Sequence, residues 1–595
     1  MKKGKRRSRG KGGSAGGAAA ANQRRRKTSA AETQAARRER RWPVFTSFAV
    51  AFFILFEMYG PAINGPFLFD DKYLPFTHPT YKELPLPHWL IGVRPTLMFT
   101  FWLNYQLSGE SPYSYHVVNV VVHFLNGVLV FLILRRLLER FDIERWRRET
   151  LAAFSGAVFL FHPLQTEAVA YVASRSENLS VFFFYAAFAV FLYRRKESIG
   201  IAESVLVLLL FGLAVTTKEH TAVLPFLLLL TDYFFQPGFS LAGVKRNWKL
   251  YAPMALAGVA GFAFVFSKLA ESDTAGFRVE GLPWYNYFAT QCKVIWIYLR
   301  MFVLPFGQNV DHDYPIVASP LDPVAVMGFA ALAATVALAW FRRRERPLVV
   351  YGFYVYLLLL APTSSFVPIK DALVERRLYL PMIGLLILTA GLLRRWKAPP
   401  KTLGAALGAV LVVLTFLGFQ RAQVWAGTIP LWEDSVAKTP RNWRANFQLA
   451  YAYFEHQRCS EAVQQYAKTA ELRPPDYRLL VDWALAYDCA GQPEEALAKL
   501  EQAAGLEATA HVYALIGMMH AKQGRHKEAL AALDKAAGIN PRFAITYFYR
   551  GNVYTAMGDY ERAAAEYRRA LERNPDLDAA ARALQRAERM LSGSR

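Results

Sequence analysis

The sequence predicts an all-α protein with two parts: a polytopic helical membrane domain of about eleven spans, then a C-terminal α-solenoid of repeated helix pairs. Two observations carry this prediction. Hydrophobic residues make up 54% of the 595 residues, and many apolar runs reach or approach the roughly 18 to 20 residues that a helix needs to cross a bilayer. From about residue 426 onward, prolines and small residues instead recur with a period close to 34 residues, which is typical of stacked helix pairs.

Positive charge is concentrated at the N-terminus. Residues 1–42 carry 15 Lys and Arg against 2 Asp and Glu, and so account for +13 of the formal net charge of +23. The Gly, Ala and Ser between these charges favour disorder. Because an apolar run follows directly after Pro43, we interpret the segment as a cytoplasmic tail that orients the membrane domain, in preference to a nucleic-acid-binding arm. The charged stretch is too long for a removable signal peptide, and no cleavage site follows it.

Eleven apolar segments are candidate spans. They are residues 44–60, 114–138, 150–166, 178–193, 201–217, 220–236, 250–270, 321–341, 348–362, 378–396 and 403–420. With the N-terminus inside, eleven crossings place the Lys/Arg clusters between spans on the cytoplasmic side and the solenoid on the opposite side. An aromatic segment, 284–304, would break this pattern if it crossed, so we expect it to be interfacial or re-entrant.

The C-terminal part contains a repeat in which prolines close helix pairs and alanines mark close helix packing. The prolines are Pro440, Pro474, Pro541 and Pro575, with Ala508 in place of a fifth, and the alanines are Ala462, Ala496, Ala529 and Ala563. The spacing resembles that of tetratricopeptide repeats, whose concave face binds peptides or proteins. We expect about four repeats and a capping helix over 577–592. A disulfide between Cys459 and Cys489 is compatible with this pattern but is not required by it.

Two adjacent carboxylates, Asp70 and Asp71, follow the first span. A globular protein does not require them there, but a carboxylate at the membrane surface can accept the proton of an acceptor hydroxyl while a lipid-borne donor lies alongside. Asp70 and Asp71 are therefore the candidate catalytic residues. The pair alone is weak support for a calcium or magnesium site, so the sequence predicts no metal ligands and no firm cofactor.

Polar residues gather at the outward end of the spans. His116, Asn119, His123 and Asn126 are spaced by 3, 4 and 3 residues, which places them on one helix face. A single residue of this kind is usually satisfied by packing, but four on one face favour a cavity. Later outward turns add further candidates. The predicted cavity-lining set is His116, Asn119, His123, His162, Glu167, Arg175, Glu219, Glu375 and Tyr379.

Four cations on the outward side are candidates for binding a lipid phosphate: Arg94, Lys218, Arg376 and Arg377. A guanidinium can hold phosphate oxygens through two parallel hydrogen bonds. For Lys218 and Glu219, an ion pair that only closes a tight turn is an equally good interpretation. The chain has no Walker loop, HExxH, GxSxG or Cys/His metal set, so hydrolase and ATPase functions lack support.

Six motifs, in order, resemble the transmembrane and tetratricopeptide repeat-containing (TMTC) family, within the GT-C superfamily of glycosyltransferases that use polyprenyl-phosphate sugars. The motifs are Phe69-Asp70-Asp71; Arg94-Pro95 with Phe101 and Leu103-Asn104-Tyr105; Tyr115-His116 with Asn119 and His123; His162-Pro163 with Thr166-Glu167-Ala168-Val169, Arg175 and Glu177; Thr217-Lys218-Glu219; and Glu375-Arg376-Arg377-Leu378-Tyr379-Leu380-Pro381. The likeness covers about residues 45–590. It implies a GT-C-like domain over 43–425 and a tetratricopeptide-repeat domain over 426–595, after the tail at 1–42.

The resemblance further implies an inverting transfer of a hexose, with mannose expected, from undecaprenyl or dolichyl phosphate to Ser or Thr of a translocated protein. The role of base carries over to Asp70, with Asp71 as its rival, and phosphate contacts to Arg376 and Lys218. The repeats would bind the acceptor. The expected location is a bacterial inner membrane with periplasmic repeats, or an endoplasmic reticulum membrane with lumenal repeats, and no nucleic-acid partner is expected.

Two other hypotheses remain open. A membrane-anchored scaffold or assembly factor would use only the repeats, and repeats on an unrelated anchor would then replace the whole chain. A transporter of lipid-linked sugars would show inverted symmetry between the two halves of the membrane domain, and the predicted spans do not display it.

Overall fold

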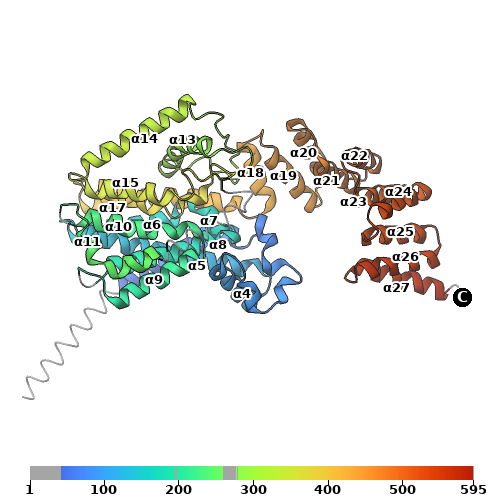
Figure 1. Cartoon of the computed structure of the whole chain (residues 1–595), viewed down its shortest axis with the longest axis horizontal. Helices are drawn as coiled ribbons and strands as arrows, with labels where there is room; N and C mark the ends of the chain where they lie inside the picture. Colours follow the sequence, from blue (N-terminus) through green and yellow to red (C-terminus); the bar gives the residue numbers. More distant parts are fainter. Residues whose placement is uncertain are drawn as a thin grey trace, which may run out of the picture.

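A computed structural model describes residues 42–593 apart from 195, 196, 237, 257, 259–275 and 278. The described residues form helices and connecting segments and contain no β-strand. Two regions follow one another (Figure 1): a bundle of long helices, and a chain of helix pairs attached at one end of the bundle. The predicted tail at 1–42, except Trp42, and most of the predicted span at 250–270 lie outside the described residues.

Helices lie at the positions of the other ten predicted spans. They are α2 (Trp42–Ile63), α5 (Pro112–Leu138), α6 (Arg145–Phe161), α8 (Arg175–Leu192), α9 (Ile201–Val215), α10 (Leu224–Phe235), α14 (Pro323–Arg342), α15 (Pro347–Leu360), α16 (Met382–Leu393) and α17 (Pro400–Val424). By length and composition, Thr46–Ile63 within α2 and the whole of α5, α14 and α17 can cross a membrane, whereas α9, α15 and α16 are shorter apolar helices. The chain is thus an apolar helical membrane protein, and the number of crossings stays a prediction.

The helix that precedes the predicted site breaks where a proline requires it. α6 ends at Phe161 because Pro163 disfavours helical geometry at His162. A short helical turn, α7 (Thr166–Ala170), and two 3₁₀ turns then lead into α8. This interruption places Glu167 at the end of the bundle, where the backbone is irregular.

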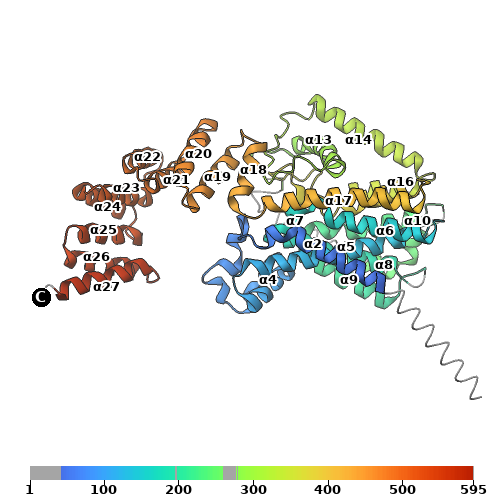
Figure 2. The same cartoon turned by 180° about the vertical axis from the view of Figure 1, so that it is seen from behind.

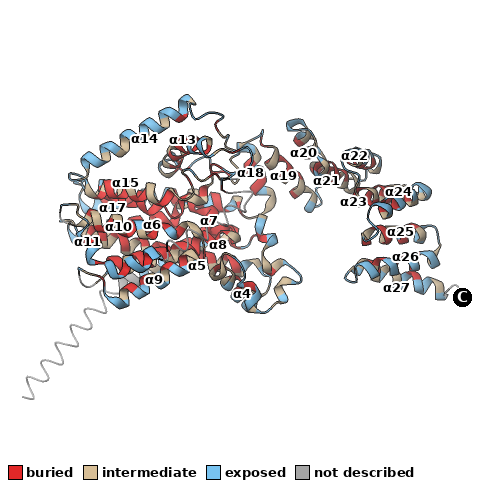
Figure 3. Ribbon diagram, in the orientation of Figure 1, coloured by how far each residue is buried: buried red, intermediate tan, exposed pale blue. Residues whose placement is uncertain are grey.

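Close contact between α15 and α16 positions the loop that carries Arg376. A Cβ added at Gly352 would lie 2.4 Å from Leu388 N, and one added at Gly384 would lie 2.3 Å from Tyr356 N, so only glycine permits this approach. The large apolar core of the bundle surrounds this pair, and Figure 3 shows buried residues along most of the long helices. In contrast, most residues of α14 are exposed on the surface of the bundle.

The segment expected to be interfacial or re-entrant is one helix, α13 (Trp284–Val303), which packs against α14. Its residues Tyr287, Tyr298 and Met301 are fully buried. The loop from α13 to α14 crosses the end of the bundle that faces the repeats. Whether α13 crosses the membrane stays a prediction.

The Lys/Arg clusters between the spans share one end of the bundle. The Arg147 guanidinium, near the start of α6, donates to the Ala398 carbonyl before α17 at 3.0 Å. The Arg395 guanidinium donates to the Glu345 carbonyl in the α14–α15 turn at 2.6 Å. We call this the basic end, defined by Arg135 and Arg136 in the last turn of α5, the start of α6, and Arg394 and Arg395. The repeats attach at the opposite end (Figure 2).

The C-terminal region follows the predicted repeat closely. After α18 (Thr428–Lys438), helix pairs form from α19 (Trp443–Glu455) and α20 (Cys459–Leu472), α21 (Tyr477–Cys489) and α22 (Pro493–Leu506), α23 (Ala510–Lys522) and α24 (His526–Ile539), and α25 (Ala544–Ala556) and α26 (Tyr560–Arg573), with α27 (Asp578–Gly593) packed on the last pair. The four periodic alanines are fully buried. The turn before each second helix contains a residue with positive φ, which is Gly491, Gly524, Gly558 or, in the first pair, Gln457.

A disulfide joins the first two pairs. Cys459 at the start of α20 and Cys489 at the end of α21 are bonded, with 5.6 Å between their Cα atoms. The pairing that the sequence left open is therefore present in the structure.

Candidate active site

A cavity of about 610 Å³ lies where the bundle meets the first repeat. Its walls come from both regions. The membrane domain contributes Asp70, Glu167, Tyr171, His312, Asp371 and Arg376, and the segment after α17 contributes Trp425, Trp432, Trp443, Arg444 and Gln448. Acidic, cationic and aromatic side chains thus meet in a space that neither region encloses by itself.

Asp70 is exposed and lines this cavity. It lies in a 3₁₀ turn, Phe69–Tyr73, and its backbone N–H donates to Tyr171 Oη at 3.1 Å. Phe69 has a positive φ of 47°, a conformation that costs energy for a residue with a side chain. The centre of the Phe69 ring lies 5.0 Å from that of the Trp432 ring and 5.7 Å from that of the Tyr171 ring. This aromatic packing holds the strained turn that directs Asp70 to the cavity.

Asp71 is fully buried and has a different role. The N–H groups of Leu68 and Ala173 donate to its two carboxylate oxygens at 3.0 and 2.7 Å. Burial raises the pKa of the Asp71 carboxyl to about 7, and the backbone hydrogen bonds oppose that rise. Because both oxygens are engaged in backbone hydrogen bonds, Asp71 fastens the loop after α2 to the 3₁₀ turn Val172–Ser174 before α8 and does not line the cavity described above.

Arg376 and Glu167 form an ion pair at the cavity wall. The Arg376 backbone N–H also donates to Glu167 Oε2 at 3.0 Å, so the carboxylate holds both ends of this residue. Glu167 is 2% exposed, whereas the Arg376 side chain is 36% exposed. The guanidinium is therefore held in place and remains accessible from the cavity.

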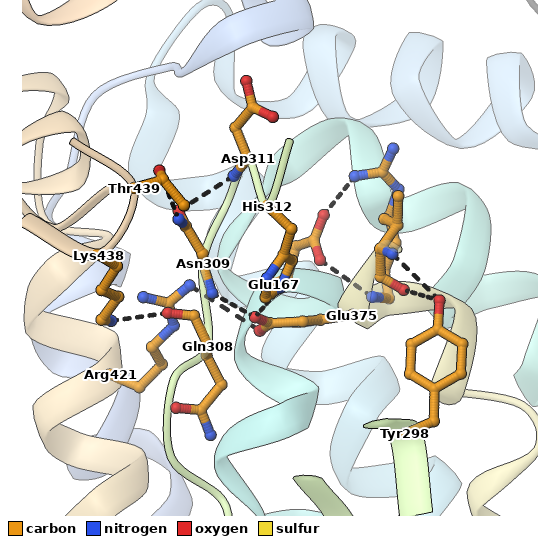
Figure 4. A network of polar contacts seen from close by, with 12 residues as sticks. Glu167, Tyr298, Gln308, Asn309, Asp311, His312, Glu375, Arg421, Lys438 and Thr439 are labelled. Carbon is orange, nitrogen blue, oxygen red and sulfur yellow. Dashed lines mark hydrogen bonds and ion pairs between the residues drawn. The ribbon is translucent and has the colours of Figure 1, made fainter. Parts of the chain in front are cut away.

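A polar network around Glu375 fastens the α13–α14 loop beside this pair (Figure 4). Glu375 accepts a hydrogen bond from the Asn309 N–H and lies 3.0 Å from His312 Nε2. Asn309 Nδ2 donates to Thr439 Oγ1 at 3.1 Å, and Lys438 Nζ donates to the Gln308 carbonyl at 2.7 Å. The loop therefore links Glu375 to the segment between α18 and α19.

Further ion pairs join the first repeat to the membrane domain. The Arg444 guanidinium contacts Asp311 at 2.7 Å and Asp371 at 3.2 Å. Lys72, directly after the acid pair, contacts Glu455 at the end of α19 at 2.9 Å. The first repeat is thus held against the cavity by contacts on two sides.

The other predicted phosphate ligands lie outside this cavity. Arg94 makes a two-pronged ion pair with Glu219, at 2.9 and 3.0 Å, and Lys218 pairs with Glu177 on α8. The Lys218-Glu219 turn is therefore not closed by a pair between these two residues, since each finds a partner on another element. Arg377 donates to the carbonyls of Asp371 and Ala372 at 2.6 and 3.2 Å. Of the four cations, Arg376 alone lines the cavity described here.

The polar face of α5 does not line this cavity. His123 lies 2.7 Å from Tyr379 Oη and 3.1 Å from the Leu160 carbonyl, and all these groups are buried. Asn126 donates to Asn178 and to Tyr379 Oη. The one-face spacing was identified correctly. His123 and Asn126 find their partners inside the bundle, on Asn178 of α8 and on Tyr379, which lies between a 3₁₀ turn and α16.

Asn119 and Arg175 are also buried in the bundle and do not line this cavity. Arg175 is 1% exposed, and its guanidinium donates to Asn119 Oδ1 at 3.0 Å and to Asn104 Oδ1 at 2.9 Å. Its charge also lies 4.6 Å from the centre of the Phe101 ring. These residues join α4 (Pro95–Ser108), α5 and α8.

The remaining members of the predicted set have separate positions. His162 contacts the Phe302 carbonyl at 3.0 Å, and His116 is buried near the N-terminal end of α5. Glu219 is occupied by Arg94, and Glu375 lies behind the cavity wall in the loop network. Glu167 is thus the one member of that set that lines the cavity.

Sequence reasoning missed the part of the wall that lies beyond residue 425. Trp432, Trp443 and Arg444 sit in helices whose periodicity indicated only repeat packing, and His312 lies in an irregular loop. The number of tryptophans at the start of the repeat region was the available signal. Within the described part of the chain, no three His, Cys, Asp or Glu side chains are grouped so as to hold a metal ion.

Comparison with known proteins adds a family context to this geometry. Tetratricopeptide repeat models match residues 510–543 and 544–577. A protein O-mannosyl-transferase of Caenorhabditis elegans is 25% identical over 394 residues, covering 64% of this chain and 54% of that protein. Protein O-mannosyl-transferase TMTC3 of Mus musculus is 24% identical over 534 residues, covering 80% and 57%.

The chain resembles the TMTC protein O-mannosyl-transferases. This result confirms the resemblance that the six motifs indicated, and the chain spans a little over half the length of these relatives. Among solved structures, the crystal structure of MamA matches with 22% identity and a TM-score of 0.23, covering 25% of this chain and 86% of that one.

Proposed function

We propose that this protein is a membrane glycosyltransferase that moves a hexose, mannose by analogy with its relatives, from a polyprenyl-phosphate donor to a Ser or Thr hydroxyl of a protein. The observation that carries the proposal is that Asp70 and Arg376 line one cavity at the repeat end of an apolar helical bundle. The proposed domain division is a tail at 1–42, a transferase domain at 43–425 and a repeat domain at 426–595.

In the proposed reaction, the acceptor oxygen attacks the anomeric carbon of the sugar from the face opposite the phosphate. Asp70 accepts the hydroxyl proton as the new glycosidic bond forms. The bond between the anomeric carbon and the phosphate oxygen breaks, and the polyprenyl phosphate leaves with that electron pair. One bond forms and one breaks, so the reaction inverts the anomeric configuration and needs no additional reactant.

Arg376 would stabilise the phosphate as negative charge develops on the leaving oxygen. Its guanidinium presents several N–H donors in a fixed plane, and Glu167 already holds it at the cavity wall. Glu167 is then a positioning residue that fixes Arg376. Lys218 and Arg94 are both paired with carboxylates away from the cavity, so we assign the direct phosphate contact to Arg376 alone.

The acceptor would enter from the repeat side. Trp443, Arg444 and Gln448 in the first repeat helix line the same cavity as Asp70, so a peptide that leaves the repeat surface has a short path to the base. The disulfide between Cys459 and Cys489 supports an oxidising compartment for this region. We therefore place the repeats in the periplasm or the lumen, with undecaprenyl or dolichyl phosphate as the lipid carrier.

The decisive experiment is transfer in vitro from polyprenyl-phosphate mannose to an extract of periplasmic or lumenal proteins, with Ser/Thr-linked hexose detected by mass spectrometry. Asp70→Asn should lower labelling by about 10² to 10⁴-fold, the usual contribution of a general base. The matched variant Asp70→Glu keeps a carboxylate and should retain part of the activity. Equal labelling by wild type and Asp70→Asn would refute the assignment of the base. If the wild-type protein transfers no hexose in this assay but is still needed by the cell, the scaffold hypothesis is favoured.

A further inference from the structure

A second large groove opens at the basic end of the bundle, opposite the end that carries Asp70, and extends along the helices. It has a volume of about 780 Å³, and its walls are α2, α5, α6 and α17. In this set α2 packs against α5 and α17, and α6 packs against the same two helices, so the four helices surround the groove. Phe124, Phe131, Leu160 and Leu411 supply apolar walls, and Arg135 and Arg145 lie at its basic end.

The groove is long enough for one acyl chain. It runs along α5 from Phe124 to Arg135, which at 1.5 Å per residue is about 16 Å, and along α6 from Arg145 to Leu160, which is about 22 Å. Half of a typical hydrocarbon core is about 15 Å. An acyl chain whose headgroup sits at the basic end can therefore lie in the groove over the full depth of one leaflet.

Two glycines of α17 leave space in this wall. A Cβ added at Gly404 or at Gly408 would meet nothing within 4 Å, so neither glycine is needed for contact between helices of this chain. Both residues line the groove. Polar atoms are few along these walls, so the groove suits a hydrocarbon chain better than water or a polar peptide.

The mouth of the groove carries uncompensated positive charge. The Arg135 guanidinium is paired with Glu149 at 2.9 Å, whereas Arg145 has no ion pair or hydrogen bond from its side chain to the described part of the chain. Arg145 is also the first residue of α6, where the first backbone N–H groups of the helix lack partners within it. Charge at this end therefore favours an anionic headgroup.

We propose that this groove binds one anionic phospholipid from the leaflet at the basic end, with its phosphate at Arg145 and an acyl chain between α5, α6 and α17. The site is distinct from the proposed donor site, because Arg376 lies at the other end of the bundle. The proposal does not depend on the transferase function, since it uses only the groove, its charge and its depth among apolar helices.

The test uses the full chain in nanodiscs of equal parts phosphatidylglycerol and phosphatidylcholine, with a trace of phosphatidylglycerol that carries a photoreactive acyl chain. Labelled peptides are identified by mass spectrometry. Labelling should concentrate on residues 404–411 of α17. Gly408→Leu fills the groove, and Arg145→Ala removes the headgroup contact. Each should lower that labelling about fivefold or more, which corresponds to a loss of about 1 kcal/mol in the free energy of lipid binding.

Two matched variants control for general effects. Gly212→Leu places the same side chain at an exposed glycine of α9 where a Cβ also meets nothing within 4 Å. Arg344→Ala removes another exposed arginine, in the α14–α15 turn outside the groove. Both should label like wild type, and all four variants should unfold at the wild-type temperature. Gly404→Leu provides a second groove-filling variant if Gly408→Leu fails to fold.

Three results would overturn the proposal. Equal labelling by photoreactive phosphatidylcholine would remove the requirement for an anion. Displacement of the label by undecaprenyl phosphate would identify the groove as a site for the donor's tail. A dimer that Gly408→Leu dissociates, without a bound phospholipid in native mass spectrometry, would identify a second copy of the chain as the occupant.

Discussion

The backbone N–H of Ala173 donates a hydrogen bond of 2.7 Å to Asp71 Oδ1. This contact separates the roles of two adjacent carboxylates that the sequence could not distinguish. Because Asp71 is held between Leu68 and Ala173, the turn has one orientation, and the neighbouring Asp70 lines the cavity.

Replacing Asp71 should destabilise the protein. Asp71→Ala leaves two buried N–H groups without acceptors, and each such group costs about 1–3 kcal/mol. Thermal unfolding of the purified protein should therefore begin at a lower temperature in Asp71→Ala than in wild type. Asp70→Asn serves as the control and should unfold like wild type, because Asp70 is exposed. An unchanged unfolding temperature in Asp71→Ala would contradict the structural role.

Replacing Arg376 by alanine or lysine should show whether the reaction needs a planar guanidinium or only a positive charge at this position. Arg376→Ala should lower kcat/KM for the donor about 100-fold or more, and Arg376→Lys should recover only part of it, because lysine cannot make two parallel hydrogen bonds to one phosphate. Steady-state kinetics with varied donor measures both.

Glu167, the ion-pair partner of Arg376, allows a second test of the same site. Glu167→Gln keeps the size of the side chain but removes its charge, so Arg376 is still present but is held less firmly. The KM for the donor should therefore rise in Glu167→Gln, but by less than in Arg376→Ala. A Glu167→Gln enzyme with wild-type kinetics would show that the ion pair does not position the guanidinium.

The wall contributed by the first repeat should determine how the acceptor binds. Arg444→Ala breaks contacts with Asp311 and Asp371 beside the cavity and should raise the acceptor KM about 3- to 10-fold, a change worth about 1 kcal/mol, with little change in the donor KM. Lys522→Ala is the matched control, since Lys522 pairs with Asp488 within the repeats. Equal effects of the two variants would argue against a specific role for Arg444.

A half-buried carboxylate in the second repeat, that of Asp482, predicts a pH dependence of stability. Burial raises the pKa of Asp482 to about 6, and Arg478, at 3.7 Å, opposes the rise only in part. The folded state therefore holds this proton more tightly than the unfolded state. Its contribution to stability is greatest below pH 4 and is lost as the pH rises toward 6.

Asp482→Asn imitates the protonated form and tests this sign. Hydrogen exchange of α21 in the full chain should be slower in the variant than in wild type at pH 7.5, and the difference should shrink at pH 4.5. A variant that exchanges faster at pH 7.5 would mean that the ionised carboxylate stabilises the repeat.

The disulfide should stabilise the first two repeats and report their compartment. Loss of a native disulfide usually costs about 2–5 kcal/mol, so Cys459→Ser should lower protection of α20 and α21 in hydrogen exchange. In cells, blocking free thiols before denaturation should leave Cys459 and Cys489 unmodified. Free thiols at both positions would place the repeats in a reducing compartment and would contradict the proposed orientation.

The sequence by itself determined the helical class, the positions of ten apolar helices of the bundle and the four helix pairs of the repeat region. Each depends on local periodicity: apolar runs long enough for a helix in lipid, and alanines spaced for close helix packing, as at Ala462 and Ala496. It also placed His123 and Asn126 on one face of α5. These features are fixed by neighbours a few residues apart, so they can be derived without knowing the fold.

Only the tertiary structure decided what those side chains do. The α5 face became a buried network because Asn178 and Tyr379, far away in the sequence, supply its partners. Lys218 is occupied by Glu177 for the same reason. Conversely, Arg444 reached the cavity because the first repeat docks on the α13–α14 loop. Whether a polar group is satisfied or available depends on contacts between distant segments, and local spacing does not specify them.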